Sequence, residues 1–143
     1  MISESFLDYI NKQKYDTVIY PNDLFDLRVQ EEMIRADEYK SFFVYAEFLF
    51  DAIHKALPAD DEKKFWKAVF KSFATQGRGS DVMGFLENDK GIGILLIDSD
   101  INGWQRLAGR IREYSKDSVA DISKPLNSVK AFVYPAYIAQ ENV

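Results

Sequence analysis

The stretch RGSDVMGFLENDKGIGILLIDSD, residues 78 to 100, decides the fold. Two apolar runs, residues 82–86 and 92–97, flank the charged segment ENDKG, residues 87 to 91. Each run has the length of a strand, and a glycine at the end of the short connection can adopt the positive φ that such turns require. We therefore predict a β-hairpin with ENDKG as its loop and Gly91 at positive φ.

The segment before this hairpin predicts a helix followed by a buried strand. SFFVYAEF, residues 41 to 48, is a continuous run of aromatic and β-branched residues, typical of a central strand covered on both faces. Residues 23–38 repeat apolar side chains every three or four positions, which predicts a helix capped by Asn22. The expected buried residues are Phe25, Val29, Met33 and Ala36, and the residues expected to face water are Arg28, Glu31, Glu32 and Arg35.

The other segments predict further helices and a last strand. A short amphipathic helix is expected at residues 3–13, a second at 49–57 that stops near Pro58, and a third from about residue 60 to Gly77. Asp100 or Asn102 is expected to cap a helix that carries Trp104 and Leu107. SVKAFVYP, residues 128 to 135, predicts a strand that is ended by proline.

This order of elements predicts one α+β domain over residues 1–143. A helix and a strand precede two helices, a strand hairpin, a helix and a strand, which describes a mixed, mostly antiparallel sheet flanked by helices in a ferredoxin-like sandwich. The pattern yields a layered fold and leaves the function open.

Composition excludes several function classes. The 23 acidic and 18 basic residues are intermixed and give a net charge of -5, so we expect no nucleic-acid partner. The chain has no cysteine, which excludes disulfides and thiolate zinc sites. The longest apolar stretch is too short for a membrane span, and the first residues lack the apolar core of a secretory signal. We expect a cytoplasmic protein.

Several motifs, in order, resemble those of GGDEF domains. Y-P-N at 20–22, EEMIRADEY at 31–39 and the SFFVYAEF strand resemble the opening of that family. RGSDVMGFL, IGILLIDSDINGWQRLAGRIRE and VKAFVYP are similar to its later motifs, so that the resemblance covers about residues 16–136. The resemblance implies a nucleotide-cyclase-like sheet, and active members of the family condense two GTP molecules into cyclic di-GMP as paired domains.

The cyclase signature is degenerate at the positions that the resemblance assigns. Its loop falls on Glu87, Asn88, Asp89, Lys90 and Gly91, or one residue later, and neither register contains the two adjacent glycines or both acids. On the preceding strand Glu47 alone stands for the family's acids, with Tyr45 or Ala46 in the other place. Glu47 and Asp89 are the candidates for one weak Mg²⁺ site, and the alternative is that both carboxylates face water. We expect no metal cofactor.

Arg78 and Asp81 match the product-binding R-x-x-D turn of the family in identity and spacing. The resemblance implies that this pair grips cyclic di-GMP, with Arg106, Arg110 and Arg112 available as further cations. The structural alternative is that Asp81 caps a turn or the entry to a strand while Arg78 is solvated, and that the three later arginines are ordinary charges of an exposed helix face.

Other chemistry-bearing residues form poorer patterns. His54 is the chain's one histidine and has no nucleophile motif around it, so we interpret it as an ordinary helix residue. Gly91 and Gly93 begin a strand and do not open a helix, so the pattern does not favour a phosphate cradle. Trp66 and Trp104 follow helical core stripes and are expected to pack, or to edge a protein interface.

Two function classes follow. The first is an inactive GGDEF-like regulatory module of bacterial signalling or exopolysaccharide systems, which binds a protein partner, a second copy of itself or cyclic di-GMP. The second is an enzyme, either a residual cyclase that uses GTP and Mg²⁺ through Glu47 and Asp89 or another activity on the same fold.

Overall fold

A five-stranded sheet forms the centre of the protein. The computed structural model describes residues 8–10, 12, 17–76, 81–116 and 123–135. The strands lie in the order β1-β3-β4-β2-β5. Their bounds are β1 (Ile19–Tyr20), β2 (Phe43–Leu49), β3 (Val82–Phe85), β4 (Gly91–Ile97) and β5 (Lys130–Tyr134). β1 runs parallel to β3 and the other pairs are antiparallel, so the predicted mixed, mostly antiparallel sheet is confirmed.

The hairpin and the central strand lie where the sequence predicts them. β3 and β4 pair in antiparallel register, with Val82 opposite Leu95 and Phe85 opposite Ile92. All seven residues of β4 are buried, as expected for a strand with neighbours on both sides and layers on both faces. β2 lies between β4 and β5, which confirms the strand predicted at residues 41–48.

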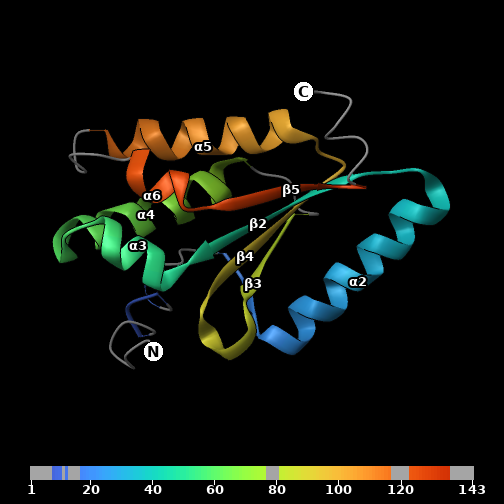
Figure 1. The fold of residues 1–143 in the computed structure, drawn as a ribbon, viewed down its shortest axis with the longest axis horizontal. Helices are drawn as coiled ribbons and strands as arrows, with labels where there is room; N and C mark the ends of the chain where they lie inside the picture. Colours follow the sequence, from blue (N-terminus) through green and yellow to red (C-terminus); the bar gives the residue numbers. More distant parts are fainter. Residues whose placement is uncertain (1–7, 11, 13–16, 77–80, 117–122, 136–143) are drawn as a thin grey trace.

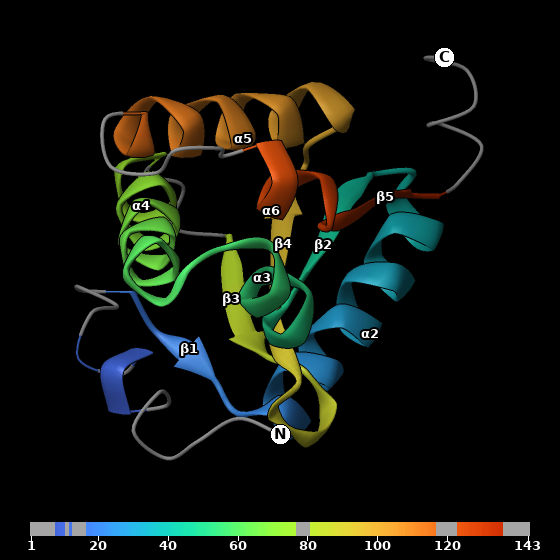
Figure 2. The same cartoon turned by 60° about the vertical axis from the view of Figure 1, so that its left-hand side comes forward.

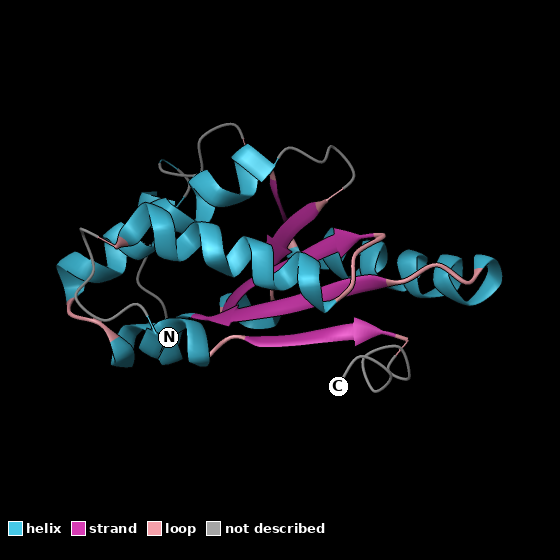
Figure 3. Cartoon of the chain, turned by 90° about the horizontal axis from the view of Figure 1, so that it is seen from above, coloured by secondary structure: helices cyan, strands magenta, loops and turns pink. Residues whose placement is uncertain are grey.

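Helices cover both faces of the sheet. They are α2 (Asn22–Tyr39), α3 (Phe50–Ala56), α4 (Ala59–Gln76), α5 (Ile101–Ser115) and α6 (Ser123–Asn127). In Figures 1 and 2, α2 lies on one side of the sheet, and α4 and α5 lie on the other. Figure 3 shows the strands between these helices from above. Apart from β1 and α6, the observed order α2-β2-α3-α4-β3-β4-α5-β5 is that of the expected α+β sandwich.

The alternation of side chains along the strands divides the buried residues into two cores. On β4, Ile92, Ile94 and Leu96 enter the larger core under α4 and α5. Leu95 and Ile97 enter a smaller core under α2. The smaller core consists of Phe25, Ala36, Phe43, Val82, Leu86, Leu95 and Ile97, with partly buried neighbours that include Tyr45 and Leu49.

α2 departs from its prediction in three details. The helix begins at Asn22 itself, after Pro21, and the Asn22 side chain donates to the Phe85 carbonyl instead of capping the helix. Glu32 is buried, contrary to the expectation that it faces water, because Arg28 and Arg35 both bind its carboxylate. Met33 is 37 % exposed, since Glu32 occupies the core-facing position beside it. Arginine pairing lets a carboxylate replace an apolar residue there.

The ends of the other helices clarify two expectations. Asp100 caps α5 by accepting a hydrogen bond from the Asn102 amide, so the sequence alternative is settled in favour of Asp100.

α6 was not predicted from the sequence. Residues 8–10 and 12 are helical, while the rest of the predicted helix 3–13 and Gly77 lie outside the described residues. Within the described part of the chain, no helix is both long and apolar enough to cross a bilayer.

Candidate functional site

The candidate site is the loop end of the β3–β4 hairpin, which contains residues 87–91, the predicted signature loop. Glu87–Asp89 form a single 3₁₀ turn. The Leu86 amide donates to the Gly91 carbonyl at 2.9 Å, and the Asp89 amide donates to the Leu86 carbonyl at 3.0 Å. The Phe50 amide, at the start of α3, donates to the Lys90 carbonyl at 3.0 Å. The loop is thus tied both to itself and to the helix that follows β2.

The prediction that Gly91 adopts positive φ is wrong. Within the loop, the residues with positive φ are Asn88, at 58°, and Asp89, at 52°. Asparagine and aspartate tolerate this left-handed conformation better than other residues with a Cβ, which explains their place in the turn. Gly91 instead opens β4, where a Cβ would lie 2.2 Å from the backbone oxygen of Phe48. Its role is to allow β2 to approach closely.

Two other glycines of the hairpin, Gly84 and Gly93, pack against the aromatic ring of Phe25. Gly84 on β3 and Gly93 on β4 are opposite each other in the register, and both face α2. A Cβ on Gly84 would lie 2.4 Å from Phe25 Cγ, and a Cβ on Gly93 would lie 2.5 Å from Phe25 Cε2. Phe25 itself is fully buried. The space that these glycines leave is therefore filled by the first turn of α2.

The one strand carboxylate of the candidate site, Glu47, is held by a neighbour on β2. The Tyr45 hydroxyl donates to Glu47 Oε2 at 2.8 Å. Burial raises the pKa of Tyr45 above its ordinary value, and the Glu47 carboxylate and Asp26 raise this pKa further. The phenol therefore stays protonated and remains a donor to Glu47 across the neutral pH range.

The two candidate Mg²⁺ ligands lie on different elements, Glu47 on β2 and Asp89 in the loop between β3 and β4. Glu47 is half-buried on β2 opposite Gly93, whereas Asp89 is exposed in the loop, four residues before Gly93. Lys90 is exposed beside Asp89. Among the described residues, no group of three or more His, Cys, Asp or Glu side chains is placed to hold a metal ion. Since Mg²⁺ requires near-octahedral oxygen ligands, this donor set does not fit the paired-metal chemistry of a cyclase.

Of the predicted R-x-x-D pair, the structure describes only the aspartate. Asp81 precedes β3, and its Oδ1 accepts a hydrogen bond from the Ile97 amide at 2.9 Å. This bond joins the start of β3 to the end of β4. Arg78 lies outside the described residues.

The remaining candidates have contacts within the fold. His54 Nδ1 lies 3.0 Å from Glu62 Oε1, between α3 and α4. Trp66 is fully buried and packs against the rings of Phe48, Phe50, Phe65 and Phe70, as expected of a core residue. Trp104 lies edge-on to Phe48 at the border of the larger core.

Sequence reasoning missed the contacts that Phe25 and Tyr45 make in this site. Phe25 was assigned to the helix's buried face, yet its contact with two glycines on other strands is a long-range pairing that periodicity along one helix does not reveal. The bond between Tyr45 and Glu47 had a visible signal. Residues two apart on a strand point to the same face, so Tyr45 and Glu47 were neighbours as soon as the strand was predicted.

Comparisons with known proteins bear on the fold. No protein-family model matches the chain, and no curated protein sequence matches it. The isolated GGDEF domain of YfiN from Pseudomonas aeruginosa superposes with a TM-score of 0.54 at 16 % identity, covering 89 % of this chain and 87 % of that one. A DGC protein from Thermotoga maritima gives 0.52 at 16 % identity, covering 88 % and 95 %. A sensory box/GGDEF family protein from Caulobacter crescentus gives 0.52 at 14 % identity, covering 89 % and 96 %. The chain therefore has the GGDEF fold, the nucleotide-cyclase-like α+β sandwich that its sequence resembles.

Proposed function

We propose that this chain is a GGDEF-like regulatory module that acts by recognition and does not synthesise cyclic di-GMP. The observation that carries the proposal is that protein atoms fill the space beside the glycines of the hairpin. Phe25 fills the space over Gly84 and Gly93, and Gly91 is in contact with the β2 backbone. A triphosphate needs glycines that leave room for its phosphates beside a pair of metal ions. Here the Phe25 side chain and the β2 backbone fill the space beside these glycines.

The charges of the hairpin support the same proposal. Glu47 accepts the Tyr45 hydroxyl, and the loop carries Lys90 next to Asp89. Two metal ions on a triphosphate need several carboxylate oxygens directed to one point, and a lysine beside the loop acid opposes a bound cation by charge repulsion. The residual cyclase, with Glu47 and Asp89 as its metal ligands, is the alternative that the experiment below must exclude.

The outer face of α2 favours a protein as the recognised partner. Leu24, Leu27 and Ile34 are 51 %, 52 % and 58 % exposed on the side of α2 away from the sheet. Tyr39 at the end of the helix is 75 % exposed. Exposed apolar side chains grouped along one helix are typical of surfaces that bind another protein. Either a partner protein or a second copy of the chain satisfies this requirement.

Cyclic di-GMP is the second ligand to be tested, through Arg78 and Asp81. A guanidinium at residue 78 is suited to bidentate phosphate or guanine contacts. Asp81 supplies one carboxylate oxygen to the Ile97 amide, so a ligand would share this carboxylate with the fold. The expected mark of a receptor is a loss of binding in Arg78→Ala, with Lys55→Ala as the control, because Lys55 is an exposed cation on α3 outside the candidate site.

One set of measurements separates these functions. The purified protein is incubated with GTP and Mg²⁺ beside an active diguanylate cyclase, and the products are analysed by mass spectrometry. We expect no pppGpG and no cyclic di-GMP from this chain. Production of either that is lost in Glu47→Gln or Asp89→Asn would overturn the proposal and establish the residual enzyme. Calorimetric titration with cyclic di-GMP then distinguishes a nucleotide receptor from a module that recognises protein alone.

A further inference from the structure

The outward face of α4 carries a row of lysines. Lys63, Lys67 and Lys71 follow one another at intervals of four residues, so they share one face of the helix and span about 12 Å along its axis. Lys64 lies beside the first of them, and all four are exposed. We call these four residues the lysine row.

Within the described residues, no carboxylate lies at ion-pairing distance from any member of the lysine row. The two arginines of α2, by contrast, both bind Glu32. Like charges four residues apart on a helix repel each other. An unpaired row of cations is therefore unfavourable by itself, even on a chain of net charge -5, and a bound anion would relieve the repulsion.

The lysines at the two ends of the lysine row, Lys63 and Lys71, each lie over a tyrosine ring. Lys63 Nζ lies 5.5 Å from the centroid of the Tyr9 ring, and the Tyr9 hydroxyl donates to the Lys63 carbonyl at 2.8 Å. Lys71 Nζ lies 4.5 Å from the centroid of the Tyr114 ring on α5. The Thr75 hydroxyl lowers the pKa of Tyr114, and the nearby cations Arg110 and Lys71 lower it too. These contacts restrict the lysine stems and extend the positive region to α5.

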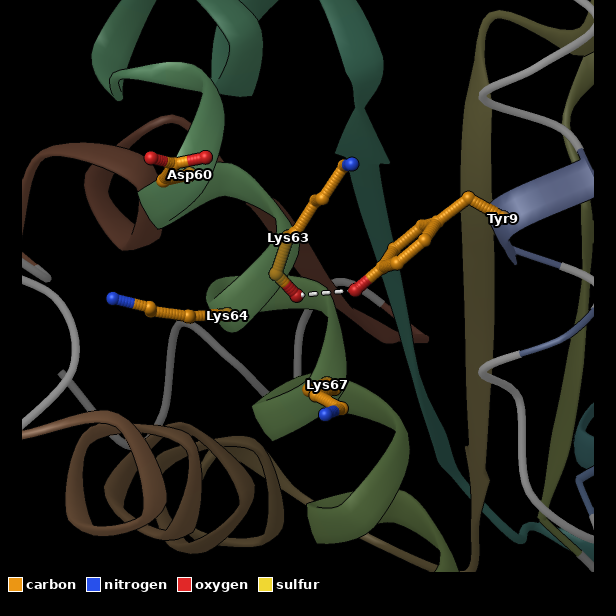
Figure 4. A pocket seen from close by; sticks show the side chains of 5 residues that line it. All are labelled: Tyr9, Asp60, Lys63, Lys64 and Lys67. Carbon is orange, nitrogen blue, oxygen red and sulfur yellow. Dashed lines mark hydrogen bonds between the residues drawn. The ribbon is translucent and has the colours of Figure 1, made fainter.

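A hollow lies along the first half of the row. It has a volume of about 380 Å³ and is lined by Tyr9, Asp60, Lys63, Lys64 and Lys67. Figure 4 shows Tyr9 closing its side next to Lys63, with Asp60 one helical turn before Lys64. The residues around the hollow are thus three lysines, one aspartate and one tyrosine, which leaves an excess of positive charge.

We propose that this hollow and the lysine row bind an oligophosphate, that is, an anion of several linked phosphoryl groups. Lysine ammonium groups are compact charges with three donors each, which suits phosphoryl oxygens presented from several directions. Carboxylates are matched better by the planar fork of arginine, and no arginine lines the hollow. The length of the row suits a chain of anions more than a single phosphate. This site is separate from the hairpin and does not depend on the recognition function proposed above.

Calorimetric titration of the full chain with sodium tripolyphosphate tests this proposal. The double variant Lys63→Gln/Lys67→Gln removes two charges and keeps the side-chain length. The matched control Lys55→Gln/Lys124→Gln removes two exposed lysine charges from α3 and α6 and leaves the net charge equal. We expect the first variant to bind about tenfold more weakly than the wild type and the control to bind like the wild type. Urea midpoints establish that both variants fold.

Further titrations distinguish the sources of the anion. Binding that weakens with added salt, and that is weaker for inorganic phosphate than for tripolyphosphate, supports the proposal. Binding of GTP that depends equally on Lys63 and Lys67 assigns the oligophosphate to a nucleotide, and failure of GTP to bind assigns it to a free oligophosphate. The proposal is wrong if tripolyphosphate releases no heat of binding, if the control variant loses as much affinity, or if hexaglutamate binds as tightly.

Discussion

The contact between Phe25 and the glycines of the hairpin predicts a specific pattern of coupling between substitutions. In the wild type, a Cβ at Gly93 would lie 2.5 Å from Phe25 Cε2 and 2.7 Å from Phe25 Cζ, atoms at the far edge of a fully buried ring. Such overpacking costs about 1–3 kcal/mol. We therefore expect Gly93→Ala to lower the free energy of unfolding by about 2 kcal/mol.

A leucine at position 25 lacks both of these ring atoms. Phe25→Leu alone should cost about 1–2 kcal/mol in lost burial. In that background Gly93→Ala should be nearly neutral, because the remaining close atom, Leu86 Cδ2 at 3.0 Å, is the end of a flexible side chain. The expected coupling free energy between the two substitutions is about 1.5–2 kcal/mol in favour of the double variant.

Gly84→Ala provides the contrast within the same pair of glycines. Its Cβ would lie 2.4 Å from Phe25 Cγ and 2.5 Å from Phe25 Cβ, atoms that leucine retains. Phe25→Leu should therefore fail to rescue it. Gly109→Ala on α5, where no atom lies within 4 Å of the added Cβ, should stabilise the protein by about 0.5–1 kcal/mol.

Urea denaturation of the wild type and these variants, followed by tryptophan fluorescence and circular dichroism, measures each free energy. Additive effects of Phe25→Leu and Gly93→Ala, or an equal rescue of Gly84→Ala, would refute the placement of the ring over the hairpin. The same result would remove the observation that carries the proposed function.

Three further predictions concern other described contacts. Asp100→Ala should cost about 1 kcal/mol in urea denaturation because it removes the acceptor of the Asn102 amide, and Asp100→Ser should recover most of that loss. Glu32→Ala should cost about 1–2 kcal/mol, since two partly exposed arginines lose their shared partner, and Glu32→Gln should cost less. The raised pKa of Tyr45 is above its unfolded value, so its contribution to stability is complete below about pH 10 and is lost as the pH rises further. Tyr45→Phe should therefore flatten the decline of the unfolding free energy above that pH, and an unchanged decline would show that Tyr45 ionises freely.

The sheet could be predicted from the sequence because its strands differ sharply from their connections. The apolar runs at residues 82–86 and 92–97 became β3 and β4 nearly unchanged, and the run at 41–48 became β2. Hydrophobic period and strand length determine such elements locally. The short helix α6 was missed because five residues that include a proline show no period.

The details of the candidate site depended on contacts between distant segments. Glu32 was expected in water because it lies off the apolar face that the helical spacing predicts, yet Arg28 and Arg35 allow its burial by pairing with it. Gly91 was assigned the turn conformation because glycine adopts positive φ most readily, whereas its lack of a Cβ is used against the Phe48 carbonyl. A glycine can serve a fold by adopting positive φ or by lacking a Cβ. Which of the two matters depends on how closely other chain segments approach it.

The unequal size of the two cores has a consequence for motion. Within the described residues, 21 buried residues form the core under α4 and α5, whereas seven form the core under α2. Free energies of local opening follow the buried apolar surface that an element must give up. The amides of α2 should therefore exchange with deuterium through a subglobal opening that leaves β2 and β4 protected. In that opened species Gly84 and Gly93 would lose the Phe25 ring that covers them and would face solvent.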